Sequence, residues 1–251
     1  MTDLKLNSAQ KAAKERLKTL LSDQVTADRQ YDGLTQTHGG RIISTDLARF
    51  LDTRYRDVPE GRPRDLAPSW DLAWRYAHAR FSRELASRGK RKLVRFMAGG
   101  WGAGKTHALE HAPVPDLTWD GTLQDIHWAK RMIDLALSKA WHVEVAYVYR
   151  DIELAIYGAV ERAKSEGRSV PLHELPHVHH SVQTTIRALI KQYQGQVNFA
   201  LLHNTGAKNV VGQTLLFAEN QLAPGGALRY PKLHEDYYSD VARKIAALNP
   251  A

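Results

Sequence analysis

The sequence predicts an α/β fold in which a parallel β-sheet is flanked by helices. Short apolar segments of strand type alternate with longer segments of helical periodicity, which is the pattern of a parallel sheet. The predicted strands span residues 41–45, 92–97, 117–119, 143–149 and 196–202. A glycine-rich loop follows the second strand and polar residues follow the others, so the carboxyl ends of the strands are expected to form a ligand crevice.

Helices are expected between and around these strands. They span residues 1–22, 70–88, 106–110, 124–139, 152–166, 174–193 (with a break at Pro176) and 234–248, while residues 57–68 are rich in Pro, Arg and Gly and are expected to form an exposed loop. Helical spacing predicts that one face of the 70–88 helix is buried. That face carries Trp70, Trp74, Ala77 and Phe81. From these elements we expect the chain to divide into three regions: an N-terminal helical extension (1–40), a core (41–206) and a C-terminal loop and helix (207–251).

Composition excludes several classes of protein. A chain of 251 residues is long enough for one large domain or for a core with an added lobe. Because it has no cysteine, it forms no disulfide, thiolate metal site or cysteine nucleophile. Neither a signal-peptide core nor a run of about 18 apolar residues is present. We therefore expect a cytoplasmic protein that does not enter a membrane.

The net charge of +8 is concentrated in the first part of the chain. Residues 1–95 hold 20 Lys and Arg against 12 Asp and Glu, whereas residues 96–251 hold 15 of each kind. The densest cluster comprises Arg83, Arg88, Lys90, Arg91, Lys92 and Arg95. Three interpretations stay open: a nucleic-acid-binding arm, a basic wall around an anionic substrate, or an ordinary solvated surface.

The glycine-rich loop fits the phosphate-binding P-loop pattern G-x-x-x-x-G-K-[ST], with a strand before it and a helix after it. It comprises Gly99, Gly100, Trp101, Gly102, Ala103, Gly104, Lys105 and Thr106. Glycines let backbone N–H groups converge on phosphate oxygens. Lys105 would reach the β- and γ-phosphates and the Thr106 hydroxyl would ligate Mg²⁺. The motif predicts a P-loop NTPase-like fold that binds ATP or GTP with Mg²⁺, and Trp101 either covers the base or simply packs.

Charged residues near the predicted crevice are candidates for the chemistry. Asp46 follows the 41–45 strand and precedes Arg49; it either caps the next helix or presents a carboxylate to the crevice. Asp120 either holds Mg²⁺ or an acceptor hydroxyl, or is a turn residue. Arg162 and Arg168 flank the end of the 152–166 helix, where a guanidinium can bridge phosphate oxygens and stabilise transition-state charge.

Four histidines lie close together at positions 173, 177, 179 and 180. They suggest a metal site, but no carboxylate pattern completes one and the spacing does not match closed sites. A single histidine that contacts substrate is the favoured interpretation.

A set of residues after the P-loop forms a recognisable pattern: Asp120-Gly-Thr122, the strand that ends before Arg150 and Asp151, Arg162, the run from Gly167 to Pro171, and Asn204. On these residues, positions 92 to 206 resemble the zeta toxin family, whose members are P-loop kinases. The best-known members phosphorylate the amino-sugar part of UDP-N-acetylglucosamine. The resemblance implies an ATP- and Mg²⁺-dependent kinase of a small hydroxylated metabolite, with a nucleotide sugar as candidate, acting as a toxin or effector that an antitoxin or immunity protein would restrain.

The family also has an Asp-x-x-Arg motif followed by a tyrosine, and its aspartate is the general base. In the best-known members this motif follows the P-loop helix, but here about ten residues separate that helix from Asp120. Asp46, Arg49 and Tyr55 reproduce the motif upstream, so we expect that this unit was moved in front of the P-loop. The resemblance then implies that Asp46 takes the acceptor proton, that Lys105, Arg162 and Arg168 hold the phosphoryl group, and that Arg49, Asp120 and Thr122 contact substrate.

Two other functions stay open. A nucleotide or polynucleotide kinase is favoured by the basic first 95 residues. A nucleic-acid-binding or regulatory module would use ATP only as a ligand. Salt-sensitive binding to arbitrary DNA or RNA would support these alternatives, and a small-molecule acceptor is favoured over nucleic acid.

Overall fold

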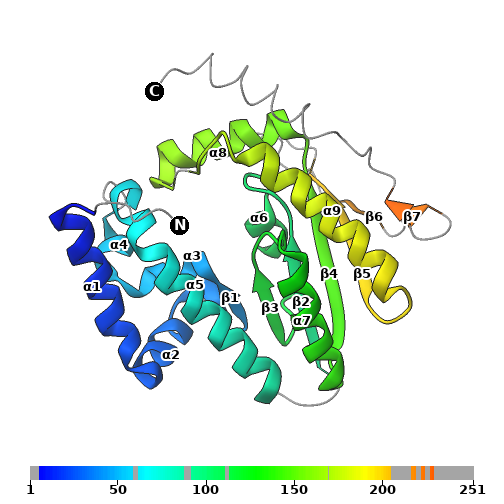
Figure 1. The fold of residues 1–251 in the computed structure, drawn as a ribbon, viewed down its shortest axis with the longest axis horizontal. Coiled ribbons are helices and arrows are strands. Elements are labelled where there is room, and N and C mark those ends of the chain that lie inside the picture. The colour runs from blue at the N-terminus through cyan, green and yellow to red at the C-terminus, as the bar shows by residue number, and fades with distance from the viewer. Residues whose placement is uncertain are drawn as a thin grey trace. The chain divides into compact units, whose positions relative to one another are not determined.

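The computed structural model describes residues 6–58, 62–87, 92–110, 113–168, 170–204, 216–218, 222–223 and 227–228. The expected helix at 234–248 lies outside these residues. The chain forms two compact units, one of Met1–Glu84 with Arg162–Ser169 and one of Leu85–Glu161 with Val170–Ala251. Figure 1 labels most of their helices and strands. The three regions expected from the sequence stay a prediction.

The second unit is built on a mainly parallel sheet. Its strands are β2 (Leu93–Ala98), β3 (Leu117–Asp120), β4 (His142–Tyr149), β5 (Asn198–His203) and β6 (Leu216–Ala218). They lie in the order β3-β2-β4-β5-β6, and all neighbours are parallel except β6, which runs antiparallel to β5. A hairpin of β7 (Leu222–Ala223) and β8 (Ala227–Leu228) follows. The predicted α/β, P-loop NTPase-like fold is confirmed.

The central strands are apolar because both of their faces are covered. Every residue of β2 from Val94 to Ala98 is buried, and successive side chains of a strand point to opposite faces of the sheet. The helices of this unit are α6 (Lys105–Glu110), α7 (Ile126–Ser138), α8 (Ile152–Glu166) and α9 (Leu175–Tyr193). Helix α7 packs against β4 and α9 (Figure 1). The last residues of α8, from Arg162, belong to the first unit.

The first unit is mostly helical, which confirms the extra N-terminal helices. Its elements are α1 (Ser8–Ser22), α2 (Gln24–Asp32), β1 (Ile42–Ser44), α3 (Thr45–Ala48), α4 (Thr53–Asp57) and most of α5 (Arg62–Ser87). Asn7 and Gln10 form a capping box that starts α1. The Asp23 side chain accepts the Thr26 N–H, which starts α2 one residue after α1 ends.

Two helix boundaries differ from the prediction. Helix α5 begins at Arg62 and contains Pro68, so the expected loop at 57–68 is wrong from Arg62 onward. The expected break at Pro176 is also wrong, because Pro176 lies in the first turn of α9. Proline is well tolerated there, since the first N–H groups of a helix have no intrahelical partner.

The aromatic face of α5 is only partly buried. Ala77 and Phe81 are buried as predicted, but Trp70 and Trp74 are 43% and 36% exposed. These two rings stack on each other, with centroids 6.1 Å apart. Periodicity identifies the side chains that share a face, but it does not show how far along the helix other elements cover that face.

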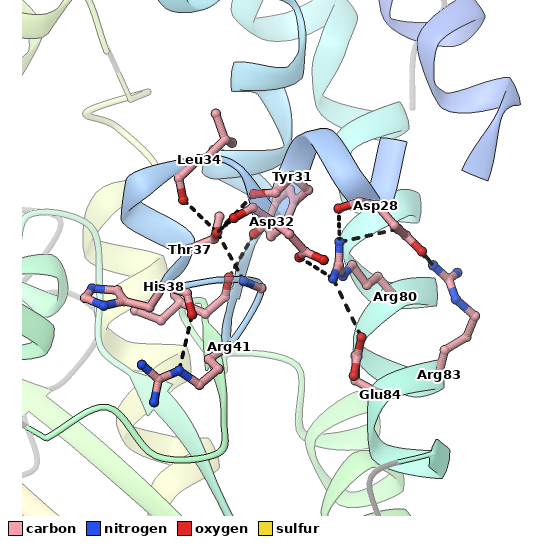
Figure 2. Close-up of polar contacts among 12 residues, drawn as sticks. Asp28, Tyr31, Asp32, Leu34, Thr37, His38, Arg41, Arg80, Arg83 and Glu84 are labelled. Atoms are coloured by element: carbon pink, nitrogen blue, oxygen red, sulfur yellow. Dashed lines mark hydrogen bonds and ion pairs between the residues drawn. The ribbon is translucent and has the colours of Figure 1, made fainter. Parts of the chain in front are cut away.

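A buried arginine on α5 holds the helices of the first unit together (Figure 2). Arg80 is 3% exposed, and its Nη2 lies 2.6 Å from Oδ1 of Asp32, while its Nη1 donates to the Asp28 carbonyl at 3.0 Å. Its guanidinium also lies 5.0 Å from the centre of the Tyr31 ring. Arg83 donates to the Asp28 carboxylate at 2.9 Å. These contacts connect α5 to α2.

Replacing Arg80 with methionine is expected to lower the free energy of unfolding by about 2 kcal/mol, because two carboxylates lose their buried cation. The effect falls below that of a fully buried pair because the Asp32 side chain is 42% exposed. Urea denaturation measures the change. The control is Arg75→Met, since Arg75 is 70% exposed and pairs with Asp71 one turn away on the same helix, and a loss of less than about 0.5 kcal/mol is expected. Equal losses of unfolding free energy in the two variants would show that Arg80 does not hold the helices of the first unit together.

Candidate active site

The P-loop joins β2 to α6 and lies in the second unit. Gly102 and Gly104 have φ angles of +74° and +92°, which glycine adopts without strain. The Ala103 N–H donates to the Gly100 carbonyl at 3.2 Å and closes a turn. The Lys105 ammonium group donates to the Gly99 and Gly100 carbonyls, at 2.8 and 3.1 Å. The loop therefore has the strand–turn–helix setting that the motif requires, with its lysine folded back over it.

Three consecutive carbonyls of the P-loop are bound by side chains from other elements. His179 Nε2, on α9, lies 2.8 Å from the Trp101 oxygen. Arg150 Nη1, just after β4, donates to the Gly102 oxygen at 2.9 Å. Asn204 Nδ2, just after β5, donates to the Ala103 oxygen at 2.9 Å. We call these three side chains the carbonyl brace.

Trp101 packs rather than standing free over the loop. Its side chain lies against a hydrophobic cluster on α8 and the start of α9. The buried members of this cluster are Ile152, Ile156, Ala159 and Leu175. Of the two alternatives for Trp101, packing is the one the structure supports.

The segment that follows β3 is tied to the P-loop. Strand β3 ends at Asp120 and runs parallel to β2, so the two strands end at the same edge of the sheet. The Gly99 N–H donates to the Thr122 carbonyl at 3.1 Å. Thr106, next to Lys105 in α6, has an exposed side chain. Mg²⁺ prefers oxygen ligands such as hydroxyl and carboxylate groups, so the side chains of Thr106 and Asp120 are of the kind that binds this ion.

The first unit brings together the other charged residues predicted from the sequence. Ser44, not Asp46, caps α3, because the Ser44 hydroxyl accepts the Asp46 N–H at 3.2 Å. The capping role considered for Asp46 is therefore wrong, and its carboxylate is available for ion pairs. One oxygen accepts a hydrogen bond from Arg49 at 2.9 Å, and the other accepts one from Arg168.

These arginines determine the charge state of Asp46. Withdrawal from water favours the neutral acid, but the positive charges of Arg168, Arg49 and Arg162 prevail and hold the pKa of Asp46 far below its usual range. Arg49 itself is buried, with 5% of its side chain exposed, whereas 44% of the Asp46 side chain is exposed. Asp46 is thus a partly exposed carboxylate, ionised at neutral pH and flanked by cations.

The predicted site residues thus fall into two groups. Asp46, Arg49, Arg162 and Arg168 gather in the first unit, although Asp46 and Arg168 are 122 residues apart in the sequence. The P-loop, Asp120 and Thr122 belong to the second unit. Sequence analysis missed the carbonyl brace. Arg150 and Asn204 had a usable signal, because both directly follow a strand, but His179 had none beyond its membership of the histidine cluster.

One histidine of the histidine cluster and one arginine of the basic cluster bind other parts of the second unit. Among the residues that the structure describes, no group of three His, Asp or Glu side chains could hold a metal ion, so the metal alternative has no support. His179 contacts the P-loop backbone instead. Arg95 is buried and donates to Glu144 and to the Pro113 carbonyl. Arg88, Lys90 and Arg91 lie outside the described residues.

His179 makes stability depend on pH. Burial lowers the pKa of His179 to about 4, with Lys105 adding to the shift, while the bond to the Trp101 carbonyl and Asp151 oppose it. The unfolded state therefore binds more protons between pH of about 6.5 and 4, and stability is expected to fall as pH drops through this range. Urea denaturation across this range measures the fall. His179→Gln should show a shallower slope, and an unchanged slope would contradict the shift.

Comparison with known proteins finds a family model that covers part of the chain. The zeta toxin family model matches residues 115–220, a segment that contains Asp120, Arg162, Arg168 and Asn204 and begins after the P-loop. No curated protein matches the chain. In the described part of the chain, no helix is long and apolar enough to cross a membrane. Zeta toxins are P-loop kinase-like phosphotransferases that use a nucleotide. The predicted resemblance is confirmed: residues 115–220, which follow the P-loop, match this family model, and we call them the zeta toxin segment.

Proposed function

We propose that the protein is an ATP- and Mg²⁺-dependent kinase that phosphorylates a hydroxyl group of a small metabolite, with a nucleotide sugar such as a UDP-amino sugar as the leading acceptor. One observation carries the proposal. Arg168, inside the zeta toxin segment, binds the carboxylate of Asp46, which belongs to the Asp-x-x-Arg motif upstream of the P-loop. This contact supports the idea that the motif was relocated and kept its role.

In the proposed reaction, the acceptor oxygen attacks the γ-phosphorus, the bond to the β,γ-bridging oxygen breaks, and ADP leaves. Asp46 accepts the proton of the acceptor hydroxyl. Arg49 was expected to contact substrate, but because it is buried and binds Asp46, the role proposed for it is to orient the Asp46 carboxylate. Lys105, Arg162 and Arg168 balance the charge on the phosphoryl oxygens. Thr106 would help to hold Mg²⁺, which would supply positive charge against the phosphates, while Asp120 and Thr122 position the acceptor.

The low pKa of Asp46 is compatible with this role. A carboxylate held by cations is a weak base, but it is ionised over the whole working pH range and keeps one orientation. Phosphoryl transfer depends mainly on positioning and electrostatics, because its transition state is loose. A well-placed weak base therefore suffices.

The test is transfer of label from γ-labelled ATP to a pooled metabolite extract in the presence of Mg²⁺, with UDP-N-acetylglucosamine assayed separately. A labelled small molecule that forms with the wild-type protein and not with Lys105→Ala would support the proposal, and its mass would identify the acceptor. ATP binding without any labelled product would overturn it and favour a macromolecular acceptor or a binding module.

A polynucleotide acceptor is the second candidate, because Trp70 and Trp74 are stacked and exposed on α5. Exposed aromatic rings are platforms on which the bases of single strands stack. The same assay with single-stranded oligonucleotides distinguishes the acceptors. Label on the oligonucleotide that falls with Trp74→Ala would favour this candidate over a nucleotide sugar.

The proposal includes a role as a toxin or effector with a cognate antitoxin, as in the zeta toxin family. Induced expression should then slow bacterial growth, and Lys105→Ala should relieve the effect. Equal growth with both proteins would remove the toxin role but would leave the kinase proposal to the labelling assay.

A further inference from the structure

We propose that the carbonyl brace sets the orientation of the P-loop peptides before nucleotide binds, with His179 as its key positioning residue. The inference rests on the proposed function in one respect, namely that the P-loop binds the phosphates of ATP. It adds residues from three separate elements to that binding step: Arg150 after β4, His179 on α9 and Asn204 after β5.

The brace acts on the direction of each peptide unit. In a trans peptide the C=O and N–H groups point in opposite directions, so a carbonyl held on one side of the loop turns the next N–H toward the other side. Holding the Trp101 and Ala103 carbonyls therefore aims the N–H groups of Gly102 and Gly104 away from the brace. Phosphate oxygens need converging N–H donors, and a carbonyl turned toward them would repel them.

The glycines of the loop make room for the brace. A Cβ on Gly100 would lie 2.1 Å from Cδ2 of His179, and one on Gly104 would lie 2.3 Å from Nδ2 of Asn204. On α8, a Cβ on Gly158 would lie 2.8 Å from Nη1 of Arg150. These glycines therefore leave the space that the side chains of the brace occupy. This is a second role, in addition to letting phosphate oxygens approach the backbone N–H groups.

His179 is the most informative member because its protonation state is defined. The residue is 6% exposed, and burial lowers the pKa of His179 to about 4, so the ring is neutral at pH 7. A neutral ring donates to the Trp101 carbonyl only as the Nε2–H tautomer. Lys105 meanwhile binds the Gly99 and Gly100 carbonyls, which lie just before the braced segment.

The first experiment measures the dissociation constant of Mg·ATP by calorimetry for the wild type and three variants. His179→Ala should weaken binding about three- to tenfold, the range expected when one net hydrogen bond is lost. His179→Gln, which restores an N–H donor, should stay within about twofold of the wild type. The matched control is His173→Ala, since His173 is 83% exposed, and no change is expected. Wild-type affinity for ATP in His179→Ala would overturn the inference.

The thermal unfolding midpoint of each variant separates positioning from stability. A purely structural role would lower the midpoint of His179→Ala and leave the dissociation constant unchanged, which would also overturn the inference. Nitrogen NMR of the His179 ring gives a second readout that needs no substitution. The Nε2–H tautomer at pH 7 is expected, and the Nδ1–H tautomer would contradict the brace.

A double-mutant cycle tests the steric match. Gly100→Ala should weaken Mg·ATP binding strongly in the wild-type background, and less in the His179→Ala background, where the clashing ring is gone. Additive effects would count against the brace.

The Lys105→Ala variant distinguishes a failure of the proposed function from a failure of the brace. If Lys105→Ala binds ATP as tightly as the wild type does, the proposed function fails. If Lys105→Ala loses affinity for ATP while His179→Ala keeps full affinity, only the brace is refuted.

Discussion

Replacing Lys105 with alanine is expected to lower kcat/KM for ATP by about 10²- to 10³-fold while the protein stays folded. The Lys105 ammonium group is the cation of the P-loop motif, and in the structure it lies over the loop, bound to the Gly99 and Gly100 carbonyls. When phosphate enters, this group would exchange carbonyl oxygens for phosphate oxygens. Its removal takes away transition-state stabilisation that no neutral side chain replaces.

Steady-state kinetics with labelled ATP measures this loss, and circular dichroism checks the fold. Lys139→Ala is the matched control, because Lys139 is an exposed lysine of the second unit just after α7, and its kcat/KM should equal that of the wild type. Turnover of Lys105→Ala at the wild-type rate would show that the P-loop does not carry the reaction.

Replacing Asp46 with asparagine is expected to lower kcat by about 10²-fold, the lower end of the contribution of a positioned general base, because a carboxylate with a low pKa is a weak base. The dissociation constant of ATP should change little, because Asp46 is proposed to act on the acceptor hydroxyl. Asparagine keeps the shape and can still accept a hydrogen bond from Arg49, but it carries no charge and takes no proton. A loss in kcat without a loss in ATP affinity is therefore the signature of this role.

The pH dependence follows from the ion pairs of Asp46. Withdrawal from water would raise the pKa of Asp46, but the charges of Arg168, Arg49 and Arg162 outweigh this effect and lower the pKa below the usual value of 3.8. The ion pairs of Asp46 therefore stabilise the fold fully above about pH 4, and this stabilisation is lost as the pH falls further. Ionisation of Asp46 should therefore produce no acid limb in kcat between pH of about 5 and 8.

Asp57→Asn is the control for Asp46→Asn, because Asp57 is an exposed aspartate of the same unit that pairs with Arg56. It should turn over at the wild-type rate. If Asp46→Asn also kept full turnover, Asp46 would not be the base, and the proposal that the Asp-x-x-Arg motif was relocated upstream of the P-loop would be withdrawn.

Local sequence patterns predicted the sheet and the P-loop well. They predicted less well which side chains of a helix are buried. Residues 92–97 were expected as a strand and form β2 at Leu93–Ala98, because an apolar run flanked by a glycine-rich turn restricts its own conformation. The exposed rings of Trp70 and Trp74 were not predicted, because burial depends on which other elements reach that part of α5. The start of α5 was missed because Pro and Gly usually mark loops, yet α5 includes Pro68.

The sequence by itself determined the α/β class, the positions of strands β2 to β5 and the phosphate-binding loop, since these depend on periodicity and on residues within a few positions of each other. Only the tertiary structure decided that Arg168 binds Asp46, and that Arg150, His179 and Asn204 hold the P-loop carbonyls. The partners in these contacts are between 48 and 122 residues apart. Such pairs depend on where distant segments cross, and no local pattern encodes that crossing.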